Sequence, residues 1–261
     1  MGIYFDSHAH YWDRRFDEEW EGGAEALLSD LLKDTVSAVV NVGTTPETSR
    51  LAIAQAMRHA GVYAAAGIHP SDCEGLDLEE ALSQIKELFS HPEYKLVALG
   101  EIGLDYYWEP YSKEMQHRFF HAQMDLAASL DVPVLIHDRE AHGDTLEVVK
   151  AHPKTRGVLH SYSGSFETAK ELIRLGYYIS FSGTVSFKNA ARVAAVAASL
   201  PHDRVLIETD APYLAPHPHR GKLNHSGLLC HTAEAIGNLW GMAGDEVARI
   251  TEENACRFFG L

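Results

Sequence analysis

The chain has 261 residues, 46% of them hydrophobic, and its 37 acidic residues outnumber 22 basic ones to give a net charge of −15. This length fits one large domain or two small ones, and it excludes neither a barrel nor an open sheet. The sequence has no apolar run near the roughly 20 residues that span a bilayer and no N-terminal signal pattern, so we expect a cytoplasmic protein without membrane segments. The acidic balance argues against an extended basic face for duplex nucleic acid, so any polyanion must be held locally.

Short aliphatic and β-branched runs alternate with helical patterns along the whole chain. Thr45 precedes a proline suited to the first helical position, and Gly61 follows the end of that helix. The longest predicted helix covers residues 112–130, and residues 229–259 are predicted to be helical with an interruption at 241–244. The predicted strands are residues 3–8, 36–42, 62–68, 95–101, 132–137, 157–160, 177–182 and 205–209.

Eight strand-then-helix units predict an α/β fold, a (β/α)8 TIM barrel. Several strands are nearly continuous apolar runs, which is typical of parallel strands buried on both faces. A doubly wound open sheet has the same local pattern and remains the alternative, because local sequence does not show whether the sheet closes. No linker or low-complexity segment divides the chain, so we predict one domain over residues 1–261.

Ionisable side chains follow most of these strands, at the end where a TIM barrel carries its active site. His8 and His10 are two residues apart on one strand and therefore project from the same face. A single histidine there is more often structural, and a single acid more often caps the next helix. Six of the eight predicted strands carry such a group, however, which favours a functional site. The groups are His8, His10, His69, Glu101, His137, His160, Glu208 and Asp210.

Imidazoles and carboxylates in these numbers predict a centre for two divalent metal ions, which activate water and stabilise attacking and leaving oxygens. The first and last strands are neighbours in a closed barrel, which would bring Asp210 to the histidines of the first strand. The predicted ligands are His8, His10 and Asp210 for one ion, His137 and His160 for the other, and Glu101 as the bridge between them. Such ligands accept Zn²⁺, Mn²⁺ or Ni²⁺ as readily as Mg²⁺.

Nine motifs run in order through nearly the whole chain, and the HxH pair, GEIGLD and ETDAPYL are highly specific in combination. The motifs are DSHAH (6–10), GIHP (67–70), GEIGLDYY (100–107), IHDREAHGD (136–144), LHSYSGS (159–165), FSGTVSFKNA (181–190), ETDAPYLAP (208–216), RGKLN (220–224) and TEENACRFFG (251–260). With these motifs the chain resembles the TatD family of metal-dependent deoxyribonucleases, within the amidohydrolase-like barrels.

The resemblance implies a phosphodiesterase that acts on DNA, in many members a 3′→5′ exonuclease preferring single strands, with Mg²⁺ or a similar ion. It assigns the ligand roles to the same six residues and makes Glu101 and Asp210 the catalytic residues. Asp210 would also accept the proton of the attacking water, and His69 would contact the scissile phosphate. We therefore expect DNA, as single strands or 3′ ends, to be the partner in the cleft, with no membrane partner and with a monomer as a suitable state.

Other residues carry weaker indications. Arg139 and Arg220 are candidate phosphate clamps because guanidinium matches phosphate geometry, or they are solvent-facing charges on loops. Asp105 either orients a metal ligand or caps a loop. Related hydrolases of the lactonase and dihydroorotase type bridge their metals with a carboxylated lysine, but Lys95 stands at the wrong end of its strand for that role.

One segment departs from the family pattern. Residues 224–228 read Asn-His-Ser-Gly-Leu where the family commonly has Asn-Glu-Pro and an aromatic residue. We expect this loop to border the substrate cleft, which leaves substrate choice open. The alternative function is therefore hydrolysis of a small phosphoester or carbonyl compound at the same metal centre, and a third is a non-catalytic metal-binding protein.

Overall fold

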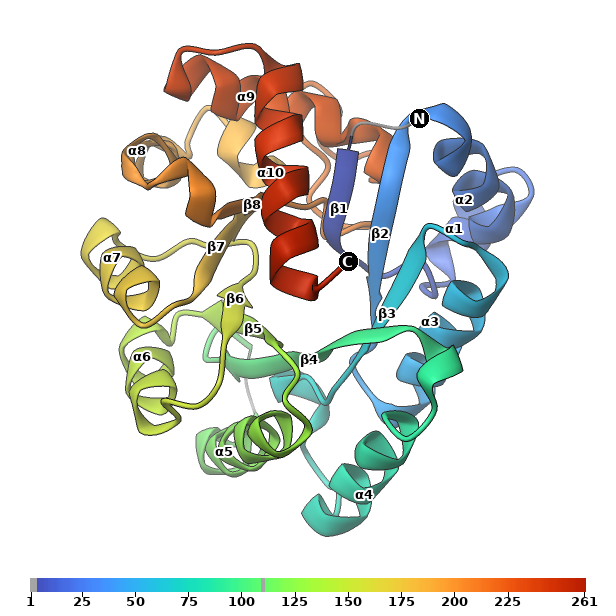
Figure 1. The fold of residues 1–261 in the computed structure, drawn as a ribbon, viewed down its shortest axis with the longest axis vertical. Helices are drawn as coiled ribbons and strands as arrows, with labels where there is room; N and C mark the ends of the chain where they lie inside the picture. Colours follow the sequence, from blue (N-terminus) through green and yellow to red (C-terminus); the bar gives the residue numbers. More distant parts are fainter. Residues whose placement is uncertain (1–3, 109–110) are drawn as a thin grey trace.

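The computed structural model describes residues 4–108 and 111–261. They form an eight-stranded parallel sheet in the order β1 to β8, with helices surrounding it on the outside (Figure 1). The predicted TIM barrel is confirmed. Its strands are β1 (Tyr4–Ala9), β2 (Val36–Val42), β3 (Val62–Ala66), β4 (Leu96–Asp105), β5 (Val134–Arg139), β6 (Gly157–Leu159), β7 (Tyr178–Phe181) and β8 (Val205–Ile207).

The helices follow the strands in alternation, with two helices after β1 and two after β8. They are α1 (Arg15–Glu19), α2 (Gly23–Asp34), α3 (Pro46–Arg58), α4 (Leu78–Leu88), α5 (Lys113–Leu130), α6 (His142–Ala151), α7 (Phe166–Arg174), α8 (Ala191–Ser199), α9 (Leu229–Trp240) and α10 (Gly244–Phe259). None of these helices combines the length and apolarity that crossing a bilayer requires.

Most predicted boundaries agree with the structure to within about two residues, and β4 is the main exception. The strand continues to Asp105 because its second half pairs with β5, including Gly103 with His137. The predicted break between the last two helices is present, where Gly241 ends α9 with a φ of 72°. The predicted start of the first strand, Ile3, lies outside the described residues.

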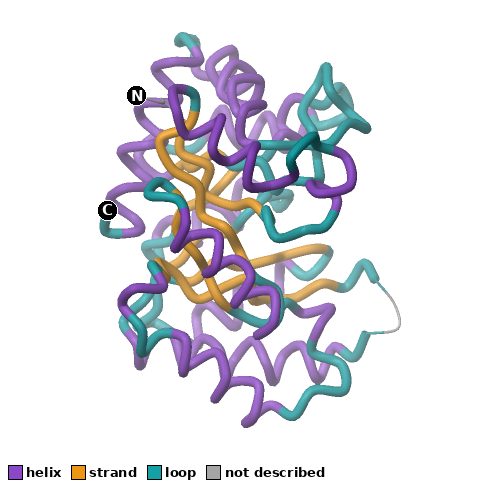
Figure 2. The backbone as a smooth tube through the Cα atoms, turned by 90° about the vertical axis from the view of Figure 1, so that its right-hand side faces the viewer, coloured by secondary structure: helices purple, strands orange, loops and turns teal. Residues whose placement is uncertain are grey.

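The interior of the barrel is apolar at one end and polar at the other. At the apolar end, α10 supplies two aromatic side chains: Phe259 stacks on Phe5 at 5.8 Å between ring centroids, and Phe258 lies 5.1 Å from Tyr178. Figure 2 shows the chain termini on one side of the barrel and the largest loops on the opposite side. Apolar side chains therefore close the end of the barrel that α10 covers. The polar side chains lie at the other end, where the strands have their carboxyl ends.

The sheet closes into a barrel through a short seam between β1 and the residues that follow β8. Ala9 and Ala211 form a parallel bridge. The His10 amide donates to the Ala211 carbonyl at 2.7 Å, and the Asp210 amide donates to the His8 carbonyl at 2.9 Å. These bonds exclude the open-sheet alternative and set Asp210 beside the histidines of β1.

A buried carboxylate, Asp6, reinforces the seam. It accepts hydrogen bonds from the Thr209 amide at 2.9 Å, from the Thr209 hydroxyl at 2.6 Å and from the Ser226 hydroxyl at 2.6 Å. Burial raises the pKa of Asp6 to about 6 in spite of these donors. Asn224 Nδ2 donates to the Thr209 carbonyl at 2.8 Å, so the segment 224–228 adds buried hydrogen bonds to the seam.

His225, in the segment 224–228, makes the free energy of unfolding depend on pH. His225 Nδ1 accepts the Gly227 amide at 3.2 Å, and its ring lies 5.3 Å from that of Trp20. Burial, followed by the nearby His219, lowers the pKa of His225 from 6.5 to about 4. Between these pH values the unfolded chain takes up a proton at this ring and the folded chain does not, so stability decreases as pH falls through this window.

We predict that replacing His225 by Gln removes part of that acid sensitivity. Urea unfolding of metal-free protein between pH 7 and pH 4.5 should show the wild type losing on the order of 1 to 2 kcal/mol more than His225→Gln. An identical pH profile for both proteins would contradict this assignment.

Candidate metal centre

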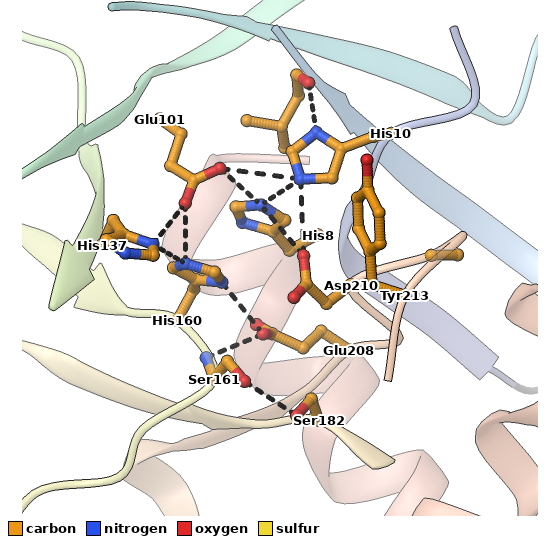
Figure 3. A network of polar contacts seen from close by, with 12 residues as sticks. His8, His10, Glu101, His137, His160, Ser161, Ser182, Glu208, Asp210 and Tyr213 are labelled. Atoms are coloured by element: carbon orange, nitrogen blue, oxygen red, sulfur yellow. Dashed lines mark hydrogen bonds and ion pairs between the residues drawn. The ribbon is translucent and has the colours of Figure 1, made fainter. Parts of the chain in front are cut away.

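The centre of the polar end is the carboxylate of Glu101, which projects from β4 between two pairs of histidines (Figure 3). Its Oε2 atom lies 3.3 Å from His8 Nε2 and 3.5 Å from His10 Nε2. Its Oε1 atom lies 2.8 Å from both His137 Nδ1 and His160 Nε2. Each oxygen therefore faces its own pair of ring nitrogens.

Asp210 completes the first group. Its Oδ1 lies 3.4 Å from His10 Nε2 and 4.0 Å from His8 Nε2, and the two Nε2 atoms are 3.2 Å apart. The bonds across the barrel seam bring this carboxylate to the end of β1. Two imidazoles and two carboxylate oxygens thus converge from β1, β4 and the residues after β8.

The second group contains fewer donors. His137 Nδ1 and His160 Nε2 are 3.2 Å apart and share Glu101 Oε1. A second carboxylate, Asp105, stands behind His137, with Oδ2 3.0 Å from the ring Nε2. Three converging donors leave coordination positions open for water and substrate.

Both groups have the spacing and chemistry of cation sites. Donors that share one ion at about 2.0 to 2.3 Å lie about 2.8 to 3.5 Å apart. The distances among His8, His10 and Glu101 and among His137, His160 and Glu101 are in this range, whereas Asp210 Oδ1 is farther from His8 Nε2, at 4.0 Å. Facing ring nitrogens at 3.2 Å, as in His8 with His10, need a proton or a cation between them. Each group could therefore hold a divalent ion, and Glu101 presents one carboxylate oxygen to each group.

The ionisation of the centre agrees with cation binding. Burial opposes a charged Glu101, but His160, His69 and His8 outweigh it and hold the pKa of Glu101 well below its usual range. Burial similarly opposes ionisation of Asp210, yet His10 and the other imidazoles lower its pKa. Two buried carboxylates are thus kept ionised among imidazoles, and an imidazole that loses its proton becomes a metal ligand beside them.

A second layer of acceptors orients the rings. Asp105 has both of the roles that the sequence offered as alternatives. Its Oδ2 contacts the candidate ligand His137, and its Oδ1 caps the following loop by accepting the Tyr107 and Trp108 amides at 2.9 and 3.3 Å. Glu208 is fully buried; its Oε1 lies 3.2 Å from His160 Nδ1 and accepts the Ser161 amide at 2.7 Å. Glu208 stands at a predicted strand end, but the sequence did not predict its contact with His160. Its position two residues before Asp210 was the only local indication of a role.

A cavity of about 470 Å³ opens above this centre. His69 stands in its wall with Nε2 3.5 Å from Glu101 Oε1, while its Nδ1 accepts the Ser71 amide at 3.1 Å. Burial lowers the pKa of His69 to about 3, so the ring is neutral and carries its proton on Nε2. The lining residues are His10, Trp12, Thr44, His69, Glu101, Asp105, Trp108, His137, Arg139, His160, Asp210, Tyr213 and Leu214.

The two predicted phosphate clamps have different positions. Arg139 lines the central cavity, with its guanidinium 3.9 Å from the centroid of Tyr107. Arg220 lines a neighbouring cavity, and of the residues that the structure describes this cavity shares Tyr213 and Leu214 with the first. The structure therefore groups Arg139, but not Arg220, with the metal centre.

The expectation that residues 224–228 border the substrate cleft is wrong. None of the five is among the described residues that line either cavity. Asn224 and Ser226 are fully buried, because their polar groups are used inside the barrel seam. The atypical segment reaches the cavity only indirectly, through the bond from Asn224 Nδ2 to the Tyr213 carbonyl at 2.6 Å.

Comparison with known proteins agrees with this geometry. Residues 5–260 match the family described as TatD related DNase. YabD of Bacillus subtilis and YcfH of Escherichia coli K12, both described as uncharacterized metal-dependent hydrolases, are 38% and 35% identical over 259 residues. The alignments cover 98% of this chain and 99% and 95% of those relatives, respectively. The crystal structure of YJJV, a TatD homologue from E. coli K12, superposes with a TM-score of 0.91 at 29% identity, over 99% of this chain and 98% of that one.

We predict that Glu208→Gln weakens metal binding about 10- to 100-fold, as loss of a partner behind a ligand commonly does. The Glu208 carboxylate accepts the Nδ1–H of His160 and so makes Nε2 the nitrogen that is available to a metal ion beside Glu101, whereas an amide at position 208 holds that tautomer less well. Titration calorimetry with Mn²⁺ measures the change.

Asp138→Asn provides the matched control. Asp138 is also a buried carboxylate at a strand end, but its Oδ2 contacts His142 at 2.8 Å, outside the centre. Equal losses in the two variants would show that Glu208 acts through general destabilisation and not through His160.

Proposed function

Because this chain belongs to the TatD-related DNase family and is a metal-dependent hydrolase, we propose that it is a phosphodiesterase that removes nucleotides from the 3′ end of single-stranded DNA. The observation that carries the proposal is that the two carboxylate oxygens of Glu101 face two different groups of metal-ligand atoms. When bound, two divalent ions held in this way supply Lewis acidity to both the attacking and the leaving oxygen of a phosphodiester.

Each wall of the cavity has a residue suited to one part of this reaction. Asp210 is ionised and faces the space above His10, so it can accept the proton of the attacking water. His69 offers an uncharged N–H to a phosphate oxygen, because its Nδ1 is occupied by the Ser71 amide. Arg139 can form paired hydrogen bonds with the same phosphate.

A hydrolase of small phosphoesters on the same centre is the second candidate. Arg139 is the one lysine or arginine among the described residues that line the central cavity, and the whole chain is strongly acidic. A substrate with one phosphate would need no more positive charge than this. Turnover of a single-stranded oligomer, compared with that of small phosphodiesters and lactones, separates the two functions.

We predict stepwise shortening of a 5′-labelled single-stranded DNA oligomer from its 3′ end in Mg²⁺ or Mn²⁺ but not in EDTA. Glu101→Ala should abolish this activity, since it removes the shared ligand of both groups, whereas Glu147→Ala on the exposed face of α6 should retain it. Gel electrophoresis of timed samples resolves the products. An oligomer that stays intact with every metal, beside turnover of a small phosphoester, would overturn the nuclease proposal.

We also predict a shallow dependence of DNA affinity on salt. Each neutralised phosphate of a single strand contributes about −0.7 to the slope of log K against log salt, and one or two contacts near Arg139 would give a slope no steeper than about −1.5. Binding isotherms for a single-stranded oligomer at 50 to 300 mM salt measure this slope. A slope near −4 or steeper would mean that six or more phosphates are neutralised outside the cavity.

A further inference from the structure

Two neighbouring aromatic side chains beside the central cavity are exposed to solvent. Tyr107 and Trp108, which follow β4, each have 52% of their surface exposed. Their rings are perpendicular, with centroids 5.0 Å apart, and Trp108 lines the cavity. Neither ring is needed to fill the core, so their position calls for another explanation.

The backbone of this pair is fixed to the metal centre. Asp105 Oδ1 accepts both amides, and Asp105 Oδ2 lies 3.0 Å from His137 Nε2. One buried carboxylate therefore sets the position of a candidate metal ligand and of Tyr107 and Trp108 together. A base held by these rings would have a fixed relation to a phosphate at the centre.

Arg139 adds a planar cation to the two rings. Its guanidinium carbon lies 3.9 Å from the centroid of Tyr107 and 5.5 Å from that of Trp108. The three side chains, which we term the stacking cluster (Tyr107, Trp108 and Arg139), present flat π and guanidinium surfaces beside the cavity. Such surfaces bind nucleobases by stacking, largely without regard to sequence.

The remaining properties of the site also favour a nucleotide. The cavity volume of about 470 Å³ is within the roughly 300 to 1,000 Å³ usual for small-ligand sites. Two further aromatic residues, Trp12 and Tyr213, also line the cavity. Trp12 Nε1 donates to the Val42 carbonyl at 2.7 Å and the Tyr213 hydroxyl donates to Asp13 Oδ2 at 2.6 Å. In a chain of net charge −15, stacking gives affinity for DNA without an extended basic surface.

We propose that the stacking cluster binds the nucleobase next to the scissile phosphate, with the base lying against Trp108 and Arg139 and with Tyr107 supporting both. The proposal rests on the phosphodiesterase function proposed above and defines its substrate as a nucleotide that carries a base. The enzyme would then select single strands and frayed ends, because a base inside a duplex has no free face for Trp108.

The test compares single-stranded DNA oligomers that differ only in whether the nucleotide on the 5′ or the 3′ side of the terminal phosphodiester carries a base or is abasic. Wild type should cleave the fully based oligomer with a kcat/KM about 10- to 100-fold above that for one of the abasic oligomers. Trp108→Ala should lose this preference. It should cleave the fully based oligomer and that abasic oligomer at the same rate, namely the rate that the wild type shows for the abasic one. Trp108→Phe should restore most of the preference, since phenylalanine keeps a stacking face.

Phe166→Ala is the matched control, because Phe166 is an exposed aromatic residue on α7 that does not line the central cavity. It should leave the base preference unchanged. If the wild type cleaves the based and abasic oligomers at equal rates, the stacking cluster does not bind the base, and the proposed nuclease function is unaffected. The base-binding role is also contradicted if Trp108→Ala lowers the cleavage rates of both oligomers by the same factor, because Trp108 would then have a structural role only. If wild type cleaves no oligomer at all, the nuclease proposal fails and the stacking cluster fails with it.

Discussion

The arrangement of the functional end of the barrel depends on the carboxylate of Glu101. It is buried within β4, and each of its oxygens meets a different pair of imidazole nitrogens. Burial disfavours a charge there, and only the surrounding rings, or cations between them, stabilise it. A neutral side chain at position 101 would leave four facing ring nitrogens without a common partner. The polar groups at the ends of β1, β5 and β6 are therefore held together by one anion.

Closure of the sheet is the second requirement, because it delivers Asp210 to the first pair of histidines. The seam contains few backbone bonds, and Asp6, Thr209 and Ser226 strengthen it with side-chain hydrogen bonds of 2.6 to 2.9 Å. These residues are far apart in the sequence but adjacent in the barrel. The unusual segment 224–228 therefore contributes to the geometry of the metal centre through barrel closure, although it does not line the cavity.

The electrostatics of the molecule limit how it can recognise a polyanion. The net charge of −15 repels an extended nucleic acid, and Arg139 is the permanent cation found among the described residues that line the cavity. The neutral donor His69, the metal-binding groups and the exposed rings of Tyr107 and Trp108 offer attraction that acts over short distances. Recognition of this kind favours a short, unpaired end of a strand over a long duplex, which agrees with the function proposed for the chain.

The sequence by itself determined the eight alternating strand–helix units and the identity of the donors, whereas the closure of the sheet into a barrel was decided by the bonds across the seam. Strand periodicity is a local property, and it placed His8 with His10 on one face and Glu101, His137 and His160 at strand ends. Family motifs then supported the same set. The tertiary structure decided which oxygen of Glu101 meets which ring, that Glu208 orients His160, that Arg220 lies in a separate cavity, and that Ser226 serves the seam and not the cleft. The extension of β4 to Asp105 also required its pairing with β5. These features depend on distances between side chains up to 220 residues apart, as for Asp6 and Ser226, and local patterns do not encode such distances.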